Sequence, residues 1–179
     1  MGCFFNELFN EKEFERQIKN QIEQAMKSIK VHFEFFKSKS SHWDWTSLMG
    51  PDKKKVLQHF PITNFISGKR GEDIQKLWRD FYDLYVILRK PNITDSEIDD
   101  FEIKAKQWIC LFCRPNQGQI NSASQIPGLF KKEEVTPYMH VFSQHIPEFL
   151  KRLKEKNLSL RLFSTSSIEK KNHNQVQCI

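Results

Sequence analysis

The sequence predicts a mostly α-helical protein of about five or six helices, and three observations support this prediction. Apolar residues recur at helical spacing over long stretches, several stretches begin with a capping residue, and alternation of period two is nearly absent. The chain has 179 residues, and its 16 phenylalanines supply large apolar side chains for a core. At most one short strand is expected, in the alternating segment LSLRLFS at 158–164.

The first predicted helix spans residues 10–37. Asn10 is its expected cap, and Glu13 stands in the position that completes a capping box. The apolar stripe of this helix comprises Phe14, Ile18, Ile22, Ala25, Met26, Ile29, Phe33 and Phe36. A short helix closed by Pro61 follows, and the turn SGKRG leads into a helix at about 72–89.

Two later helices begin at recognisable N-terminal signals. Thr94 with Glu97 three residues further on forms a second capping box. Thr136 is a good cap, and the proline that follows it is favoured at the first helical position. The polar segment at 114–129 lies between them and is rich in Asn, Gln, Ser, Gly and Pro, which is typical of an irregular, flexible insertion.

A single helical domain is therefore expected over residues 10–172, between an N-terminal tail at 1–9 and a short truncated tail at 173–179. Four unevenly spaced cysteines do not suggest a secreted disulfide framework, so an intracellular location, nuclear or cytoplasmic, is favoured. No run of about eighteen apolar residues is present, and a membrane-spanning helix is not expected.

The net charge is +6, and much of it lies near the C-terminus. Residues 151–179 carry seven basic side chains against two acidic ones. Such a segment can contact the phosphates of nucleic acid, and it is equally consistent with a solvated helix face. The candidate nucleic-acid-binding residues are Lys151, Arg152, Lys154, Lys156, Arg161, Lys170 and Lys171.

Residues with metal-binding side chains occur as two pairs, Cys110-x2-Cys113 and His140-x4-His145. Zinc readily takes two thiolates and two imidazoles. On a straight helix the two histidines would point about 140° apart, so they can share an ion only if the helix bends or ends between them. Pro147 supplies a reason for such a break, because its ring clashes with the carbonyl group four residues earlier. Alternatively, the cysteines are small apolar core residues and the histidines only make hydrogen bonds.

The stretch VTPYMHVFSQHIPEFLKR, followed by LFSTSSIEKKNHN, resembles the end of the catalytic domain in the recombination-activating and Transib group of transposases. In that group a His-x4-His motif is followed by proline and an acidic residue, and Glu-x-x-Asn comes some twenty residues later. The specific motif covers about 135–172, and weaker similarity extends back to about residue 43. The matching positions here are His140, His145, Pro147, Glu148, Glu169 and Asn172.

The resemblance implies an RNase H-like fragment in which Glu169 is the last catalytic carboxylate and His140 and His145 belong to a structural zinc site. Enzymes of this type use three carboxylates to hold two divalent ions, and this chain has a candidate for one. The resemblance therefore implies a transposon-derived fragment without catalytic activity, to which Mg²⁺ or Mn²⁺ is relevant only if a complete active site were supplied. Its expected partners are DNA, further copies of itself, or other transposase-like chains.

Two alternatives remain open from the residues themselves. The chain could be a helical protein-interaction module that uses the amphipathic stretch at 10–37 to bind a partner or to self-associate. It could also be a nucleic-acid-binding domain stabilised by zinc.

Overall fold

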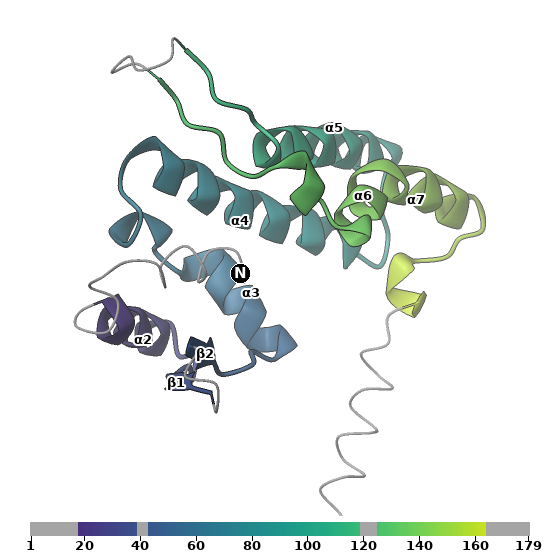
Figure 1. Ribbon diagram of the computed structural model, residues 1–179. Helices are drawn as coiled ribbons and strands as arrows, with labels where there is room; N and C mark the ends of the chain where they lie inside the picture. Colours follow the sequence, from purple (N-terminus) through teal and green to yellow (C-terminus); the bar gives the residue numbers. More distant parts are fainter. Residues whose placement is uncertain (1–17, 39–42, 119–124, 164–179) are drawn as a thin grey trace, which may run out of the picture. The chain divides into compact units, whose positions relative to one another are not determined.

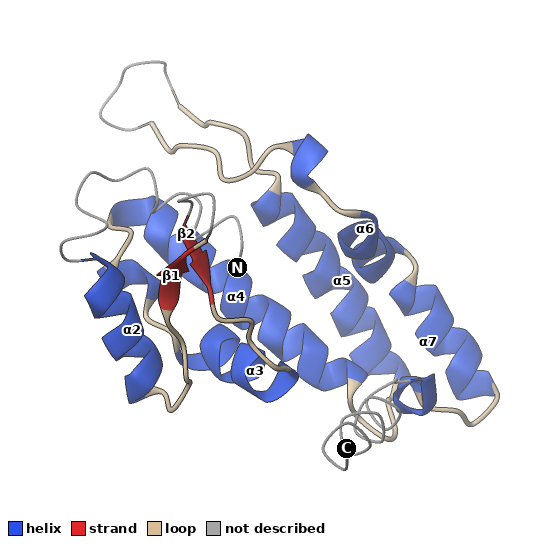
Figure 2. Ribbon diagram, turned by 60° about the horizontal axis from the view of Figure 1, so that its bottom comes forward, coloured by secondary structure: helices blue, strands red, loops and turns tan. Residues whose placement is uncertain are grey.

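The computed structural model describes residues 18–38, 43–118 and 125–163, and these ranges contain six α-helices and one small antiparallel hairpin (Figures 1 and 2). The predicted mostly helical class is confirmed. The chain divides into two compact units, residues 1–82 and 83–179, where the sequence pattern predicts one domain. The boundary falls inside helix α4, which runs through it as one continuous helix, so no turn signal marks it in the sequence.

The first unit contains a helix, a hairpin and a second helix, followed by the beginning of a long one. In order these are α2 (Lys19–Ser28), β1 (Phe35–Lys37), β2 (Trp43–Trp45), α3 (Gly50–His59) and α4 (Gly68–Leu88), with a 3₁₀ turn, η2 (Ile62–Asn64), before α4. The two strands pair antiparallel, with Phe35 opposite Trp45 and Lys37 opposite Trp43. Phe60 stacks on Phe65 with ring centroids 5.3 Å apart. The first unit has its own apolar core, whose fully buried residues include Ile22, Met26 and Phe60.

The prediction of one helix over residues 10–37 is wrong after Ser28, where α2 ends. The chain leaves α2 through Lys30, whose φ is 57°, and residues 31–37 are extended. Residues 31–35, VHFEF, alternate between apolar and polar side chains. This alternation predicts a strand, whereas the apolar spacing of the longer stretch predicts a helix. The expected cap at Asn10 and its partner Glu13 lie outside the described residues. The buried residues of the extended segment are Val31, Phe33 and Phe35.

The second unit is built on three helices in which α5 packs against both of the others, and they pack against each other. They are α5 (Asp95–Phe112), α6 (Pro137–Gln144) and α7 (Ile146–Glu155), with a 3₁₀ turn, η3 (Lys132–Glu134), before α6. The predicted capping box is present: Glu97 N–H donates to Thr94 Oγ1 at 3.2 Å, and Thr94 N–H donates to Glu97 Oε2 at 2.8 Å. Thr136 Oγ1 accepts the N–H of Met139 at 3.3 Å, so the second predicted cap is also confirmed.

The core of the second unit joins the apolar face of α5 to one ring from α6 and to the buried Leu150 and Leu153 of α7. Phe142 meets Phe101 edge-to-face at a centroid distance of 5.5 Å and Trp108 at 5.7 Å. These aromatic contacts fix α6 across the middle of α5. The buried residues of α5 are Ile98, Phe101, Ala105, Trp108 and Phe112.

The polar segment at 114–129 is irregular in its described parts, as predicted, apart from one isolated antiparallel bridge between Gln117 and Ile126. Phe130, directly after it, stacks on Phe112 with ring centroids 4.6 Å apart. The segment therefore leaves the end of α5 and returns to it.

The sequence predicts at most one short strand, near 158–164, and the part of this segment that the structure describes forms none; β1 and β2 lie elsewhere in the chain. Leu160–Phe163 form a 3₁₀ turn, η4, in which the N–H of Leu162 donates to the carbonyl oxygen of Ser159 at 3.0 Å. A lone strand would leave its backbone groups without a neighbouring strand, whereas a turn of this kind satisfies some of them locally. Ser159 Oγ also donates to the carbonyl oxygen of Lys90 at 3.2 Å, which holds the segment near the start of the second unit.

Candidate functional site

The helix that carries the two predicted histidines breaks at His145. Helix α6 ends one residue before it, and His145 itself has φ −105° and ψ −27°. Pro147 lies buried in the first turn of α7, where it has no N–H to donate and where its ring excludes a straight continuation of α6. The buried Ser143 hydroxyl donates to the carbonyl oxygen of His140 at 3.3 Å within the last turn of α6.

This break brings the two imidazole rings together. Both His140 and His145 are exposed, and their ring centroids lie 5.2 Å apart with an interplanar angle of 74°. Residues five apart on a continuous helix would point away from each other. The helix thus breaks at His145, two residues before Pro147, as the proline predicts. The break places the two histidines side by side on the surface.

The two cysteines at the end of α5 differ in their surroundings. Cys110 is exposed, whereas Cys113, which caps the helix, is half-buried. Burial raises the pKa of the Cys113 thiol, and Cys110 and Glu133 add to this effect while the charge of Lys132 opposes it. A thiol that stays protonated is a weak nucleophile and has to lose its proton before it can bind a metal.

The histidine pair and the cysteine pair do not come together in one site. Within residues 18–38, 43–118 and 125–163, no three residues among the histidines, cysteines, aspartates and glutamates are grouped so that they could hold a metal ion. The arrangement therefore does not fit the expected four-ligand zinc site of Cys110, Cys113, His140 and His145. Zinc bound by the two histidines with ligands from elsewhere stays an untested prediction.

Several predicted site residues cannot be placed. Glu169 and Asn172 of the transposase-like motif, and the basic residues Lys170 and Lys171, lie outside the described residues. Arg161 belongs to η4.

The basic residues of α7 are engaged with carboxylates. Lys151 Nζ lies 3.1 Å from Asp99 Oδ1 and 3.6 Å from Glu102 Oε2. Lys154 Nζ lies 2.6 Å from Asp95 Oδ2. Arg152 pairs with Glu148 within α7 at 2.6 Å. Three of the predicted phosphate-binding residues therefore have acidic partners.

These ion pairs change the titration of their members. The hydrogen bond to Asp99 raises the pKa of Lys151, and the hydrogen bond from Lys106 lowers the pKa of Glu102, with a smaller contribution from Lys151. Three of the five acidic residues of α5 stand at intervals of four and three, at positions 95, 99 and 102, which places these three on one helix face. That spacing is the signal by which sequence reasoning could have found the partners of the basic segment.

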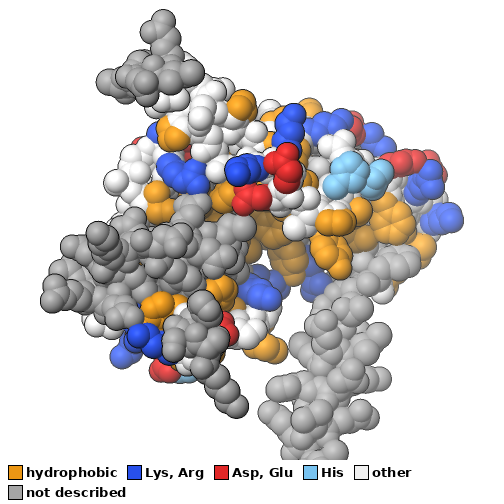
Figure 3. All heavy atoms as spheres, viewed as in Figure 1, with side chains coloured by type: hydrophobic (Ala, Val, Ile, Leu, Met, Phe, Trp, Pro, Cys, Tyr) orange, Lys and Arg blue, Asp and Glu red, His pale blue; other side chains and the backbone are white. Residues whose placement is uncertain are grey.

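A further surface, which the sequence did not single out, lies on the outer side of α6 and α7. Tyr138 is 87% exposed, Val141 45% and Phe149 40%. Beside them is a hollow of about 370 Å³, lined by residues of both helices. We call this surface, defined by Tyr138, Val141, His145, Ile146 and Phe149, the α6–α7 face. Figure 3 shows hydrophobic side chains gathered next to histidine side chains over these helices.

The α6–α7 face is continuous across the helix break. Tyr138 and Val141 are three residues apart on α6, which places them on one side of that helix. Val141, His145 and Phe149 line the same hollow, so this side of α6 continues onto α7. Glu148 and Arg152 also line the hollow and place one negative and one positive charge at its rim. The face is therefore apolar at its centre and balanced in charge at its edge.

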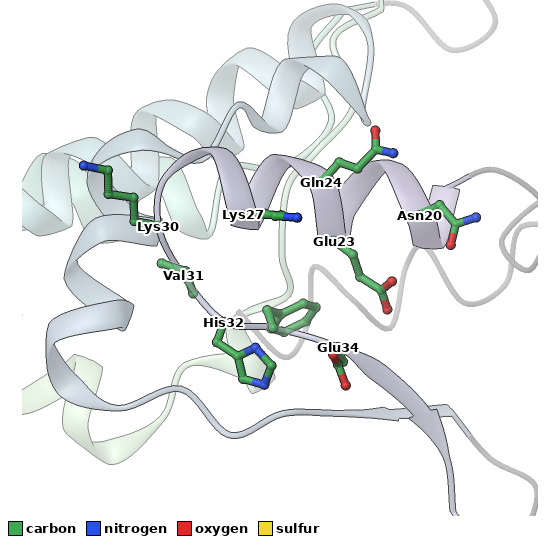
Figure 4. A pocket seen from close by; sticks show the side chains of 9 residues that line it. Asn20, Glu23, Gln24, Lys27, Lys30, Val31, His32 and Glu34 are labelled. Atoms are coloured by element: carbon green, nitrogen blue, oxygen red, sulfur yellow. The ribbon is translucent and has the colours of Figure 1, made fainter.

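A larger hollow of about 540 Å³ lies in the first unit, between α2 and the extended residues that follow it (Figure 4). Glu23 and Lys27 project from the helix, whereas His32 and Glu34 come from the extended segment. Glu23 Oε1 is used within the fold: it accepts the N–H of Phe35 at 2.9 Å and pairs with Lys19 at 3.4 Å. Charges of both signs line the hollow, and they do not define one ligand class.

No protein-family model, curated protein or solved structure matches this chain. Among the described residues, none of the helices combines the length and the apolar character that a membrane span requires.

Proposed function

We propose that this chain is a helical protein-interaction domain that binds another protein through the α6–α7 face. The observation that carries the proposal is the exposed apolar stripe of Tyr138, Val141 and Phe149 beside a hollow of about 370 Å³. Contiguous apolar surface rimmed by polar groups is typical of protein-binding sites. Tyrosine is enriched in such sites because it contributes a large apolar area together with a hydroxyl group.

The intramolecular ion pairs of α7 favour protein binding over nucleic-acid binding. A lysine held by a carboxylate has less to gain from a phosphate, because the carboxylate contact must be given up first. Lys151 and Lys154 are held in this way by α5. Nucleic-acid contact therefore remains a weaker proposal, resting on Lys156, on Arg161 and on residues outside the described ranges.

We also propose that the chain descends from a DDE-type transposase and has no catalytic activity of its own. The motif that runs from His140 to Asn172 supports the descent, and the single candidate carboxylate, Glu169, supports the lack of activity. Purified protein incubated with duplex DNA and Mn²⁺ should produce no nicks. Cleavage that disappears in Glu169→Gln would contradict this part of the proposal.

Photo-crosslinking in cells tests the binding surface. A photoreactive phenylalanine analogue in place of Tyr138 should give adducts of higher mass on irradiation, because this position would lie within a protein contact. The control places the same analogue at Gln107, an exposed position of α5 outside the α6–α7 face. Equal adduct yields at the two positions, or none at Tyr138, would contradict the proposal.

A further inference from the structure

The C-terminal end of α5 carries two thiols that stand three residues apart, Cys110 and Cys113. We propose that these two cysteines form a reversible disulfide, by exchange with a low-molecular-weight disulfide of the glutathione type. The inference goes beyond the proposed function and does not depend on it, because neither cysteine belongs to the α6–α7 face.

The spacing of the two cysteines brings their backbones within the range of a disulfide. On an α-helix, Cα atoms three residues apart are about 5 Å from each other, given the rise and the turn per residue. Disulfides join residues whose Cα atoms are about 4.4–6.8 Å apart. The two thiols are also near enough to affect each other electrostatically, since Cys110 contributes to the raised pKa of Cys113.

The end of the helix allows the movement that the new bond requires. Cβ atoms three residues apart on a helix are about 5–6 Å from each other, whereas a disulfide needs about 3.5–4.5 Å. The last turn must therefore tighten. Helix α5 ends at Phe112, and Cys113 has φ −88° and ψ 12°, so its Cβ can shift without interrupting the helix. The hydrogen bond most affected is that from the N–H of Cys113 to the carbonyl oxygen of Ile109, at 3.0 Å.

The residue before Cys113 is held in place by the chain that returns to α5. Phe112 is buried and stacks on Phe130, and the N–H of Phe130 donates to the carbonyl oxygen of Phe112 at 3.0 Å. These contacts oppose a general unwinding of the last turn and concentrate the distortion at Cys113. A disulfide that forms against such resistance is strained, and strained disulfides are reduced readily. The bond is therefore reversible.

The different exposure of the two thiols sets the order of the steps. Cys110 is exposed, so its thiolate sulfur attacks one sulfur of the small disulfide, and the first small thiol leaves. Cys113 is half-buried beside it. It gives its proton to solvent, its sulfur attacks the Cys110 sulfur, and the second small thiol leaves. Two protein thiols are thereby oxidised to one disulfide, and the small disulfide is reduced to two thiols, which take up the two protons.

Oxidised glutathione added to the full chain tests this bond by intact-mass spectrometry. Cys3→Ser and Cys178→Ser first remove the other two cysteines of the chain. The product should be lighter than the reduced protein by two hydrogen atoms, and dithiothreitol should restore the reduced mass. In the same background, Cys113→Ser should stop at the mixed disulfide of Cys110 with glutathione. Accumulation of that mixed disulfide while both cysteines are present, or no reaction at all, would overturn the proposal.

A pair at the same spacing inside the helix is the matched control. Gln107→Cys combined with Cys113→Ser leaves thiols at positions 107 and 110, both exposed and both within the regular part of α5. Closure of this pair should be at least about tenfold slower, because it breaks hydrogen bonds of a continuous helix. Circular dichroism checks that each variant keeps its helices. Equal rates of closure for the two pairs would overturn the part of the proposal that assigns the bond to the helix end.

Discussion

A single proline shapes the candidate site. Pro147 ends the hydrogen-bond ladder of α6, and the chain turns at His145 before α7 begins. The turn brings His140 and His145 within 5.2 Å of each other, measured between ring centroids. It also places Phe149 of the second helix on the same side as Val141 of the first. One residue thus explains both the histidine pair and the shape of the face beside it.

The two cysteines of α5 should differ in reactivity. Cys113 is half-buried and its pKa is raised by burial, whereas Cys110 is exposed. At pH 7.5 we expect iodoacetamide to alkylate Cys110 at least about tenfold faster than Cys113. Tandem mass spectrometry resolves the two sites. In the urea-unfolded chain the rates should become equal, and faster alkylation of Cys113 in the folded chain would contradict its burial.

Glu97 should make the second unit sensitive to acid. Hydrogen bonds from Lys90 and from Thr94 lower its pKa from 4.5 to about 2. Because the folded pKa lies below the unfolded one, the stability from this carboxylate is present above about pH 4.5 and is lost as pH falls toward 2. Glu97→Gln should therefore be less stable than the wild type at pH 7, and the difference should shrink as pH falls through this window.

Urea unfolding followed by circular dichroism measures that difference. Thr94→Ala, which removes the cap, should cost about 1 kcal/mol of unfolding free energy at pH 7. A difference between Glu97→Gln and the wild type that is independent of pH would contradict the role of the Glu97 charge.

At the scale of elements, α5 and α7 are joined by a ladder of opposite charges. Asp95, Asp99 and Glu102 of one helix pair with two lysines of the other. Each exposed pair adds little stability by itself, about 0–1 kcal/mol. The main consequence of these pairs is for nucleic-acid binding, because they neutralise part of the positive charge of α7 within the fold.

The ladder should limit any affinity for DNA. We expect Lys151→Ala combined with Lys154→Ala to change duplex binding by no more than about twofold, because both lysines are already paired with carboxylates of α5. Asp95→Asn combined with Asp99→Asn and Glu102→Gln should release the two lysines and strengthen binding. The slope of log affinity against log salt should then steepen by about 2. Fluorescence anisotropy over a salt series measures both, and a tenfold loss in the lysine variant would contradict the ladder's role.

The helix caps and faces could be predicted because their signals are local. Thr94 and Thr136 cap where the sequence places them, and the buried positions of α5 recur at helical spacing. The segment after α2 was misassigned because Val31, Phe33 and Phe35 satisfy a period of two, while some of its apolar positions also fit a helix. The hairpin that decides between them requires pairing with Trp43–Trp45, a contact that periodicity does not reveal.

The candidate site was predictable only in part. Pro147 predicted the helix break, because its effect acts on the preceding turn of the same helix. The exposure of Tyr138 and Phe149 was not predictable, because both fit an apolar pattern that is usually buried. Whether such residues are covered depends on how α6 and α7 pack on α5, which is a tertiary property.

At the scale of the whole molecule, the chain consists of two compact units, each with its own apolar core. The α6–α7 face and the ion-pair ladder belong to the second unit. The proposed function therefore needs only this unit's surface, and the transposase-like motif at 140–148 falls on the same two helices.

The most direct test of the account is whether Tyr138 becomes covered by protein. Fluorotyrosine labelling gives three ¹⁹F resonances, and Tyr138→Phe identifies the one from position 138. In dilute protein this resonance should shift fully between H₂O and D₂O, because the side chain is 87% exposed. The account predicts that this solvent shift decreases as increasing amounts of an extract of its own cells are added. A solvent shift that stays complete under all of these conditions would contradict the α6–α7 face as a protein-binding surface.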